Sequence, residues 1–353
     1  MGIRERFLSA MRRKSGGYIP KDISLTPPQL DRFEAFYGHR DYASEWRIPV
    51  RSVSLPFPKT HDGNLGWLGS ISARTTVDSW GIGHEKARDG SHFERLIHPL
   101  ASAEREDQVR AYPFPLPADD QSVHSAKEAV KALQGNDFVV TIAVSPVGGT
   151  IFWPAYKLRG MENLLCDMID NEPLATELFN RVTAICTEQA RLAASCEPDL
   201  IHLADDLGTQ LSTYMSPELF RRWIKPGLAA VIRSAKTVHP AVLISFHSDG
   251  AMQSFIPDLI EIGVDILNPI QPECMEPSDI KNHYGDVLSL YGCIGTQTTM
   301  PFGTPDEVRR LTFQCCDKLG SNGGLWIAPT HVIEPEVPWE NILAFIEAAS
   351  QFE

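Results

Sequence analysis

One short stretch, residues 242–250, combines side chains that can bind a metal ion with a local geometry that can aim them. A β-branched and apolar run predicts a buried strand, which is followed by His247, Asp249 and a glycine that lets the backbone turn. Residues i and i+2 of an extended segment face the same way, so His247 and Asp249 can direct two ligand atoms at one point. His247 could equally be a buried histidine with satisfied hydrogen bonds, and this stretch alone does not separate the two interpretations.

Four further predicted strands also end in side chains that could do chemistry. These are Asp205, Asp206 and Gln210 after residues 200–203, Gln271, Glu273 and Cys274 after 264–268, Cys293 and Gln297 after 287–291, and His331 after 325–328. Packing alone does not readily account for consecutive strand ends of this composition. Imidazole, thiolate and carboxylate groups together are ligands that Zn²⁺ prefers, and three protein ligands leave an open position for catalysis. The pattern therefore indicates a metal-assisted enzyme.

Several of these residues also admit a structural interpretation. Asp205 and Asp206 could act in catalysis or contact the substrate, but aspartates in such loops also cap helices. Cys274 could be a ligand or a buried thiol, and Cys293 is expected to line the pore rather than bind metal. Gln297 is a candidate catalytic residue that donates a hydrogen bond to the substrate. The candidate substrate contacts are Asp78, Gln210, Gln271 and Cys293.

The elements that must position these residues alternate regularly along the chain. Apolar strands alternate with helices from residue 122 onward, and earlier strands are expected at 19–23 and around Val77. Continuous apolar runs are typical of parallel strands buried on both faces. About eight strands, most of them followed by a helix, predict an α/β fold: a (β/α)8 TIM-type barrel with an N-terminal helical extension. A doubly wound sheet is the alternative, but no G-x-G-x-x-G or P-loop motif follows any strand.

Length and charge narrow the class of protein. We expect residues 1–353 to form one domain, with 1–60 as an extension that includes the first strand. The net charge is −13, although Lys and Arg outnumber Asp and Glu eleven to six up to residue 59. A chain this acidic is a poor partner for nucleic acid. No apolar run is long enough to predict a membrane span, and no secretory signal is evident. Seven cysteines without a C-x-x-C pair favour reduced thiols and a cytoplasmic location.

Motifs spread over nearly the whole chain, from Arg4 to Ala349, resemble those of the uroporphyrinogen decarboxylase superfamily. They are residues 4–14 with Pro20, 78–81 (Asp-Ser-Trp-Gly), 205–208 (Asp-Asp-Leu-Gly), 215–218 (Met-Ser-Pro-Glu), 302–308 and 331–341. The superfamily contains both true decarboxylases and corrinoid-dependent methyltransferases. The resemblance is therefore specific for the superfamily and leaves the reaction open.

Two departures from the family patterns bear on that reaction. True decarboxylases carry an N-terminal arginine-rich clamp for substrate carboxylates, whereas residues 18–26 read Tyr-Ile-Pro-Lys-Asp-Ile-Ser-Leu-Thr. The zinc methyltransferases have His-x-Cys after the fifth strand and a cysteine after the eighth, where this chain has His247-x-Asp249 and His331. Related cobalamin-independent methionine synthases add a glutamate, a role open to Glu273 or Cys274. The resemblance thus implies a Zn²⁺ site at His247 and His331, completed by Asp249, Glu273 or Cys274.

We therefore expect a metal-dependent methyltransferase that moves a methyl group between a small methylated substrate or thiol and a corrinoid, such as methylcobalamin. A small corrinoid protein is the expected partner, and the chain could form a homodimer. One alternative is a metal-free decarboxylase acting on a tetrapyrrole or another small carboxylate, in which Asp205 or Asp206 stabilises a protonated ring. Another is a corrinoid- or tetrapyrrole-binding protein without chemistry of its own.

Overall fold

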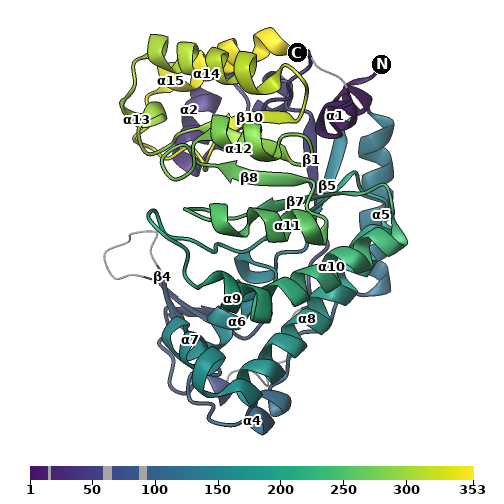
Figure 1. Cartoon of the computed structure of the whole chain (residues 1–353), viewed down its shortest axis with the longest axis vertical. Coiled ribbons are helices and arrows are strands. Elements are labelled where there is room, and N and C mark those ends of the chain that lie inside the picture. The colour runs from purple at the N-terminus through teal and green to yellow at the C-terminus, as the bar shows by residue number, and fades with distance from the viewer. Residues whose placement is uncertain (15–16, 59–65, 87–93) are drawn as a thin grey trace.

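A computed structural model describes residues 1–14, 17–58, 66–86 and 94–353 of the chain. Its centre is a curled sheet of seven strands, all neighbours parallel, in the order β1-β5-β6-β7-β8-β9-β10 (Figure 1). The strands are β1 (Val50–Val53), β5 (Val139–Ala143), β6 (Leu200–Ala204), β7 (Leu243–His247), β8 (Ile266–Ile270), β9 (Ser289–Ile294) and β10 (Leu325–Pro329). Parallel isolated bridges from Lys21 to Ile327 and from Leu25 to Ile333 place the segment before β1 beside β10, in the eighth position. This arrangement confirms the TIM-type fold.

The expectation for the second strand of the barrel was wrong. Val77 belongs to a separate antiparallel sheet formed by β2 (Thr75–Val77), β3 (Gly83–Lys86) and β4 (Glu94–Ile97). The barrel instead uses β1, whose sequence Val-Arg-Ser-Val lacks the continuous apolar run of the other strands. Its weak signal follows from its place at the edge of the parallel sheet, where it pairs only with β5.

Helices surround the sheet and mostly lie where the sequence predicts them. They are α1 (Ile3–Met11), α2 (Pro27–Tyr37), α3 (Tyr42–Glu45), α4 (Glu106–Ala111), α5 (Asp120–Gly135), α6 (Phe152–Arg159), α7 (Met161–Asp170), α8 (Glu172–Ser195), α9 (Pro217–Leu219), α10 (Lys225–Val238), α11 (Ile256–Ile262), α12 (Pro277–Tyr284), α13 (Thr299–Phe302), α14 (Pro305–Gly320) and α15 (Trp339–Ala349). Start signals explain several boundaries. Thr304 and Glu307 form a capping box at α14, and the Ser216 hydroxyl accepts a hydrogen bond from Leu219 N at α9. The short helix α6 was not expected.

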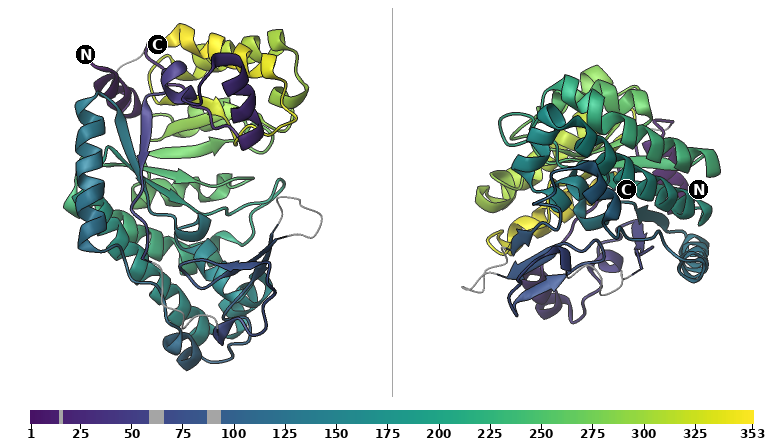
Figure 2. Two further views of the ribbon diagram at one scale, coloured as in Figure 1. Left: turned by 180° about the vertical axis from the view of Figure 1, so that it is seen from behind. Right: turned by 90° about the horizontal axis from the view of Figure 1, so that it is seen from below.

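Helix α1 closes the amino-terminal end of the barrel. Its fully buried Phe7 and Met11 pack in one cluster with the first inward-facing residues of the strands, including Leu200, Leu243 and Trp326. Burying each such side chain is worth ~1.5–3 kcal/mol. The two termini lie close together at this end of the molecule (Figure 2), where Ile19 N donates to Phe352 O. Chemistry is therefore confined to the opposite, carboxyl-terminal end of the strands, as in other TIM-type barrels.

Within the described residues, no helix combines the length and apolar character needed to cross a membrane.

Candidate active site

Three acidic and imidazole side chains meet where β6 and β7 end. One ligand atom each from Asp206, His247 and Asp249 lies within 4.8 Å of the others. His247 Nε2 is 3.6 Å from Asp206 Oδ1 and 3.8 Å from Asp249 Oδ1. The side chains of His247, Asp206 and Asp249 are 26%, 27% and 33% exposed, so they are reachable from the mouth of the barrel. One nitrogen and two carboxylate oxygens in this arrangement suit a divalent cation.

The orientation of His247 is set by the neighbouring strand. Its Nδ1 lies 2.6 Å from Asn268 Oδ1 on β8. An amide oxygen only accepts, so Nδ1 donates to it and Nε2 is the ring atom that faces the two carboxylates. Asp249 N in turn donates to Asp206 Oδ1 at 3.0 Å, which ties the two loops together. The ring is thus oriented with Nε2 toward the space between the two carboxylates, where a metal ion would bind.

The electrostatics of this cluster favour a bound positive charge. Burial raises the pKa of Asp249, His247 and His331 oppose the rise, and the neighbouring Asp206 carboxylate adds to it. Two carboxylates near one another destabilise each other's ionised form. A divalent cation between them would remove that repulsion.

Asp205, although adjacent to Asp206, points away from the mouth. Its carboxylate is fully buried and accepts hydrogen bonds from Thr150 N, Ile151 N and Trp153 N at 2.8–3.2 Å. It therefore caps the start of α6. Burial raises the pKa of Asp205 to about 7, and the backbone donors oppose that rise. The candidate catalytic pair is thus split between a capping residue and a residue in the cluster.

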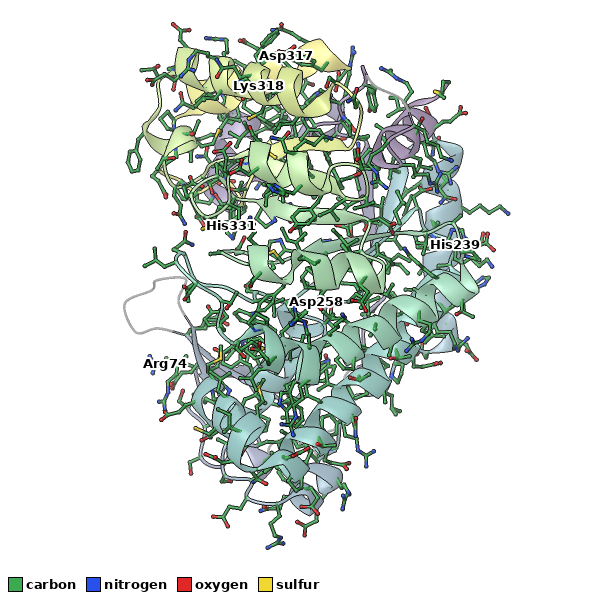
Figure 3. The ribbon with its side chains drawn as sticks, viewed as in Figure 1. Arg74, His239, Asp258, Asp317, Lys318 and His331 are labelled. Carbon is green, nitrogen blue, oxygen red and sulfur yellow. The ribbon has the colours of Figure 1, made fainter. Side chains whose placement is uncertain are left out.

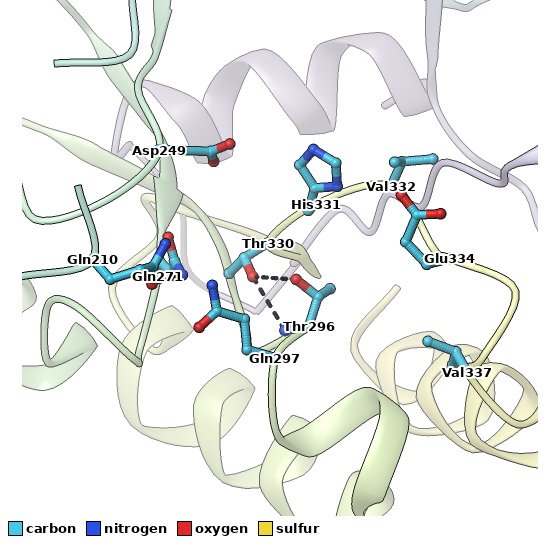
Figure 4. A pocket seen from close by; sticks show the side chains of 10 residues that line it. All are labelled: Gln210, Asp249, Gln271, Thr296, Gln297, Thr330, His331, Val332, Glu334 and Val337. Atoms are coloured by element: carbon cyan, nitrogen blue, oxygen red, sulfur yellow. Dashed lines mark hydrogen bonds between the residues drawn. The ribbon is translucent and has the colours of Figure 1, made fainter. Parts of the chain in front are cut away.

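A pocket of about 210 Å³ lies beside the cluster, and Asp249 borders both (Figure 4). Its lining residues are Gln210, Asp249, Gln271, Thr296, Gln297, Thr330, His331, Val332, Glu334 and Val337. Gln271 Nε2 donates to Gln210 Oε1 at 3.1 Å, and Gln271 Oε1 accepts from Gly250 N at 3.2 Å. His331 lies at the same side of the molecule as β4 and α13 (Figure 3). Side-chain amides and one imidazole therefore face a substrate bound beside the cluster.

Glu273 and Cys274 lie next to this pocket but outside the group of three. Glu273 Oε1 accepts from Gln297 N and Thr298 Oγ1, both at 3.2 Å, while its buried Oε2 has no partner among the described residues. Cys274 Sγ donates to Gln210 Oε1 at 3.2 Å. Burial, then the charges of Glu273 and Asp249, raise the pKa of Cys274. Its thiol is therefore held protonated unless a cation approaches.

Cys293 and Asp78 occupy other surroundings. Cys293 is buried and lines a different cavity, which it shares with Cys315 of α14. Asp78 Oδ1 accepts from Trp80 N and Ile82 N, and its Oδ2 lies 2.9 Å from His84 Nε2. Asp78 thus organises the turn between β2 and β3, with one oxygen engaged by an imidazole.

The uroporphyrinogen decarboxylase (URO-D) family model matches residues 96–352. The chain belongs to the uroporphyrinogen decarboxylase family. Among solved structures, a methyltransferase from Methanosarcina mazei is similar over 100% of this chain and 99% of its own, with 17% identity and a TM-score of 0.66. The match to a β-L-arabinopyranosidase from Geobacillus stearothermophilus covers 98% of this chain and 78% of that enzyme's chain. Its identity is 10% and its TM-score is 0.43. The comparison with curated proteins gave no match.

Sequence reasoning missed one residue near the mouth of the barrel, Lys157 on α6. In the described part of the chain its ammonium forms no ion pair or hydrogen bond, and it lies 5.2 Å from the centre of the Trp153 ring. Burial lowers the pKa of Lys157, while the charges of Asp78, Asp206 and Glu94 oppose the fall. Lys157 therefore links the cluster electrostatically to the β2–β4 sheet. A lone lysine in an unexpected helix carries no sequence signal that would have revealed it.

Proposed function

We propose that this member of the uroporphyrinogen decarboxylase family is a metal-dependent methyltransferase. It moves a methyl group between a small methylated substrate or thiol and a corrinoid such as methylcobalamin. The observation that carries the proposal is the cluster of Asp206, His247 and Asp249 at the mouth of the barrel. The full-length similarity to a solved methyltransferase supports the same branch through its fold.

The metal is proposed to be Zn²⁺, held by His247, Asp206 and Asp249. His331, Glu273 and Cys274 are the neighbouring groups that could complete or replace a ligand. A set rich in nitrogen and oxygen is harder than the sulfur-rich sites of zinc methyltransferases, so its preference for Zn²⁺ over Fe²⁺ or Mn²⁺ is reduced. When bound, the cation supplies a positive charge that deprotonates a thiol or polarises the heteroatom bearing the methyl group.

The chain's own residues would bind and orient the substrate. Gln210 and Gln271 are already hydrogen-bonded to each other and present a fixed amide surface. Gln297 is anchored through its backbone N–H to Glu273, so its side chain projects from a fixed point of the loop. We propose that these amides position the substrate beside the cluster. His331 is proposed to exchange a proton with that substrate. A small corrinoid protein is the proposed partner.

Metal content tests the proposal directly. The protein, purified without chelator, is expected to carry about one divalent ion per chain by elemental analysis, and added Zn²⁺ should raise the melting temperature of the stripped form. His247→Ala should lose the ion while circular dichroism shows a folded barrel, and the exposed His124 of α5, changed to alanine, is the matched control. A wild type without metal, and without a thermal response to Zn²⁺, would refute the metal-dependent reaction.

A metal-free carboxy-lyase acting on a tetrapyrrole or small carboxylate is the second candidate. The match to the decarboxylase family supports it, and Asp206 is the carboxylate at the mouth that could stabilise a protonated ring. A third candidate, a corrinoid- or tetrapyrrole-binding protein without chemistry, would give a spectral change with cobalamin and no turnover.

A further inference from the structure

A second cavity, of about 430 Å³, lies between α3 and the inward-facing residues of β5 to β10. Its walls include Asp22, Arg51, His202, Asn268 and Trp326. Among the described residues, none lines both this cavity and the amide-lined pocket at the mouth. The two therefore open separately, although Asn268 of the cavity wall is hydrogen-bonded to His247 of the cluster.

The cavity exists because the middle of the barrel is not filled by large side chains. TIM-type barrels are normally packed there by bulky branched residues. Here Thr141 and Ser245, which follow Val139 and Leu243 by two positions on their strands, are small and polar. In addition, no ladder within the described residues joins the segment around Asp22 to β1, so the barrel has an unpaired seam. Asp22 and Arg51 line the cavity from the two sides of that seam.

One acid and one base face this space from fixed positions. Asp22 accepts hydrogen bonds from Ile23 N at 2.8 Å and from the Tyr291 hydroxyl. Arg51 is held by donation to Ile48 O and Val50 O and by its stacking on the Phe138 ring, 4.2 Å from the ring centre. Both charges are therefore oriented before any ligand arrives.

An unsatisfied donor accompanies the two charges. The Trp326 indole Nε1 is buried without a hydrogen-bond partner in the described structure. The Trp326 ring stacks on Tyr291, with ring centres 3.8 Å apart and planes inclined by 6°, so the indole cannot turn away. Buried polar groups in proteins are almost always paired. The indole nitrogens of Trp80 and Trp339 are unpaired in the same way, so this donor does not by itself mark a ligand.

We propose that this cavity binds a small zwitterion of the free amino acid class, with its ammonium toward Asp22 and its carboxylate toward Arg51. A lone anion would be buried near the Asp22 carboxylate, and a lone cation near the Arg51 guanidinium. Only a dipolar ligand compensates both charges, which is the condition for burying charged groups without a large penalty. The polar walls supply hydroxyl and amide groups for the remaining hydrogen bonds.

A thermal-shift and calorimetric screen of the full chain tests the proposal. The probes are the free amino acids and glycine betaine, each compared with the carboxylic acid that lacks the amine and the amine that lacks the carboxylate. At least one zwitterion should raise the melting temperature saturably, and its two fragments should bind at least ~10-fold more weakly. Failure of every zwitterion to bind, or equal binding of a fragment, would overturn the proposal.

Variants then locate the site. Asp22→Asn keeps the size of the side chain and should weaken binding at least ~10-fold, because it removes one charge of the pair. Arg51→Gln removes the other charge and should also weaken binding at least ~10-fold; it decides the question if Asp22→Asn does not fold. Asp249→Asn, which alters the pocket at the mouth and no residue of this cavity, should bind the zwitterion as wild type does, which separates the two sites. Unchanged affinity in both cavity variants would place the ligand elsewhere and refute the assignment.

Discussion

His247 and Asn268 are joined across β7 and β8 by a hydrogen bond of 2.6 Å between Nδ1 and Oδ1. Because the amide occupies Nδ1, Nε2 is the free ring nitrogen, and it faces Asp206 and Asp249. Such a second partner fixes both the tautomer and the ring orientation of a metal-binding histidine. The candidate centre therefore takes its residues from the ends of the neighbouring strands β6 and β7, and Asn268 of β8 holds the His247 side chain.

Replacing the holding residue should weaken metal binding without removing a ligand. Asn268→Leu keeps the branched shape of the side chain and takes away the acceptor for His247 Nδ1. We expect metal affinity to fall ~10- to 100-fold, measured by competition with a chromophoric chelator. Asn136→Ala on the surface is the matched control. Unchanged affinity in Asn268→Leu would show that the tautomer is not set from β8.

Asp205 and Asp206 offer a matched pair of neighbouring substitutions with opposite outcomes. Asp205→Ala leaves the Ile151 and Trp153 N–H groups without this acceptor and should lower the free energy of unfolding by ~2–5 kcal/mol. Asp206→Ala removes a partly exposed carboxylate and should cost at most ~1 kcal/mol, but it should abolish stoichiometric metal. Urea unfolding and elemental analysis of the two variants separate the roles. Metal loss in Asp205→Ala with normal stability would contradict this division.

The split between these two aspartates shows how far sequence reasoning reaches. Strand residues alternate between faces, so only one of two adjacent aspartates can point into the mouth. Asp206 shares the inward phase of His202, whereas Asp205 shares that of the fully buried Ile201 and Leu203, which pack outside the barrel. The apolar runs located the strand ends correctly. Which face of each strand points into the barrel could be determined only from the structure.

Other parts of the site depend on contacts between distant segments and had no local signal. The edge strand β1 carries Arg51 and an exposed Ser52, so its sequence does not read as a buried strand. The approach of Lys157 to Asp206 depends on α6 being anchored by Asp205. By contrast, the pairing of His247 with Asp249 followed directly from their spacing of two along an extended segment.

Lys157 should oppose metal binding through its charge. Lys157→Met removes a positive charge near Asp206 while keeping an unbranched side chain beside Trp153. We expect divalent metal affinity to rise ~2- to 10-fold, an effect that weakens with added salt. Lys157→Arg, which keeps the charge, should bind metal as wild type does. Equal affinity in the methionine and arginine variants would show that Lys157 does not act on the cluster electrostatically.

Asp22 gives the barrel interior a pH dependence whose sign follows from its surroundings. Burial raises the pKa of Asp22 to about 6, while the hydrogen bonds from Tyr291 and Ile23 oppose the rise. The folded state therefore holds a proton that the unfolded chain releases at about pH 4. The contribution of Asp22 to the free energy of unfolding is fully present below about pH 4 and is lost as the pH rises through about 6. Wild type should lose up to ~3 kcal/mol relative to Asp22→Asn over that window, measured by urea unfolding. A constant difference between the two proteins from pH 4 to pH 7 would show that Asp22 is not perturbed.

The protein is expected not to decarboxylate uroporphyrinogen III. That substrate carries many carboxylates, and its recognition requires several cationic groups in one pocket. The residues that line the pocket at the mouth include no lysine or arginine, and two of them, Asp249 and Glu334, are acidic. Lys21, the one basic residue in the segment where decarboxylases carry their arginine clamp, is buried and paired with Glu353, so it cannot serve as a replacement. Lys157 remains near the mouth, but three carboxylates share its charge. Anaerobic incubation with uroporphyrinogen III, followed by chromatography of the oxidised porphyrins, should give no products with fewer carboxylates, while an authentic decarboxylase assayed in parallel does. Turnover comparable to that enzyme would reverse the choice between the two reactions and make Asp206 the residue to test as the stabiliser of a protonated ring.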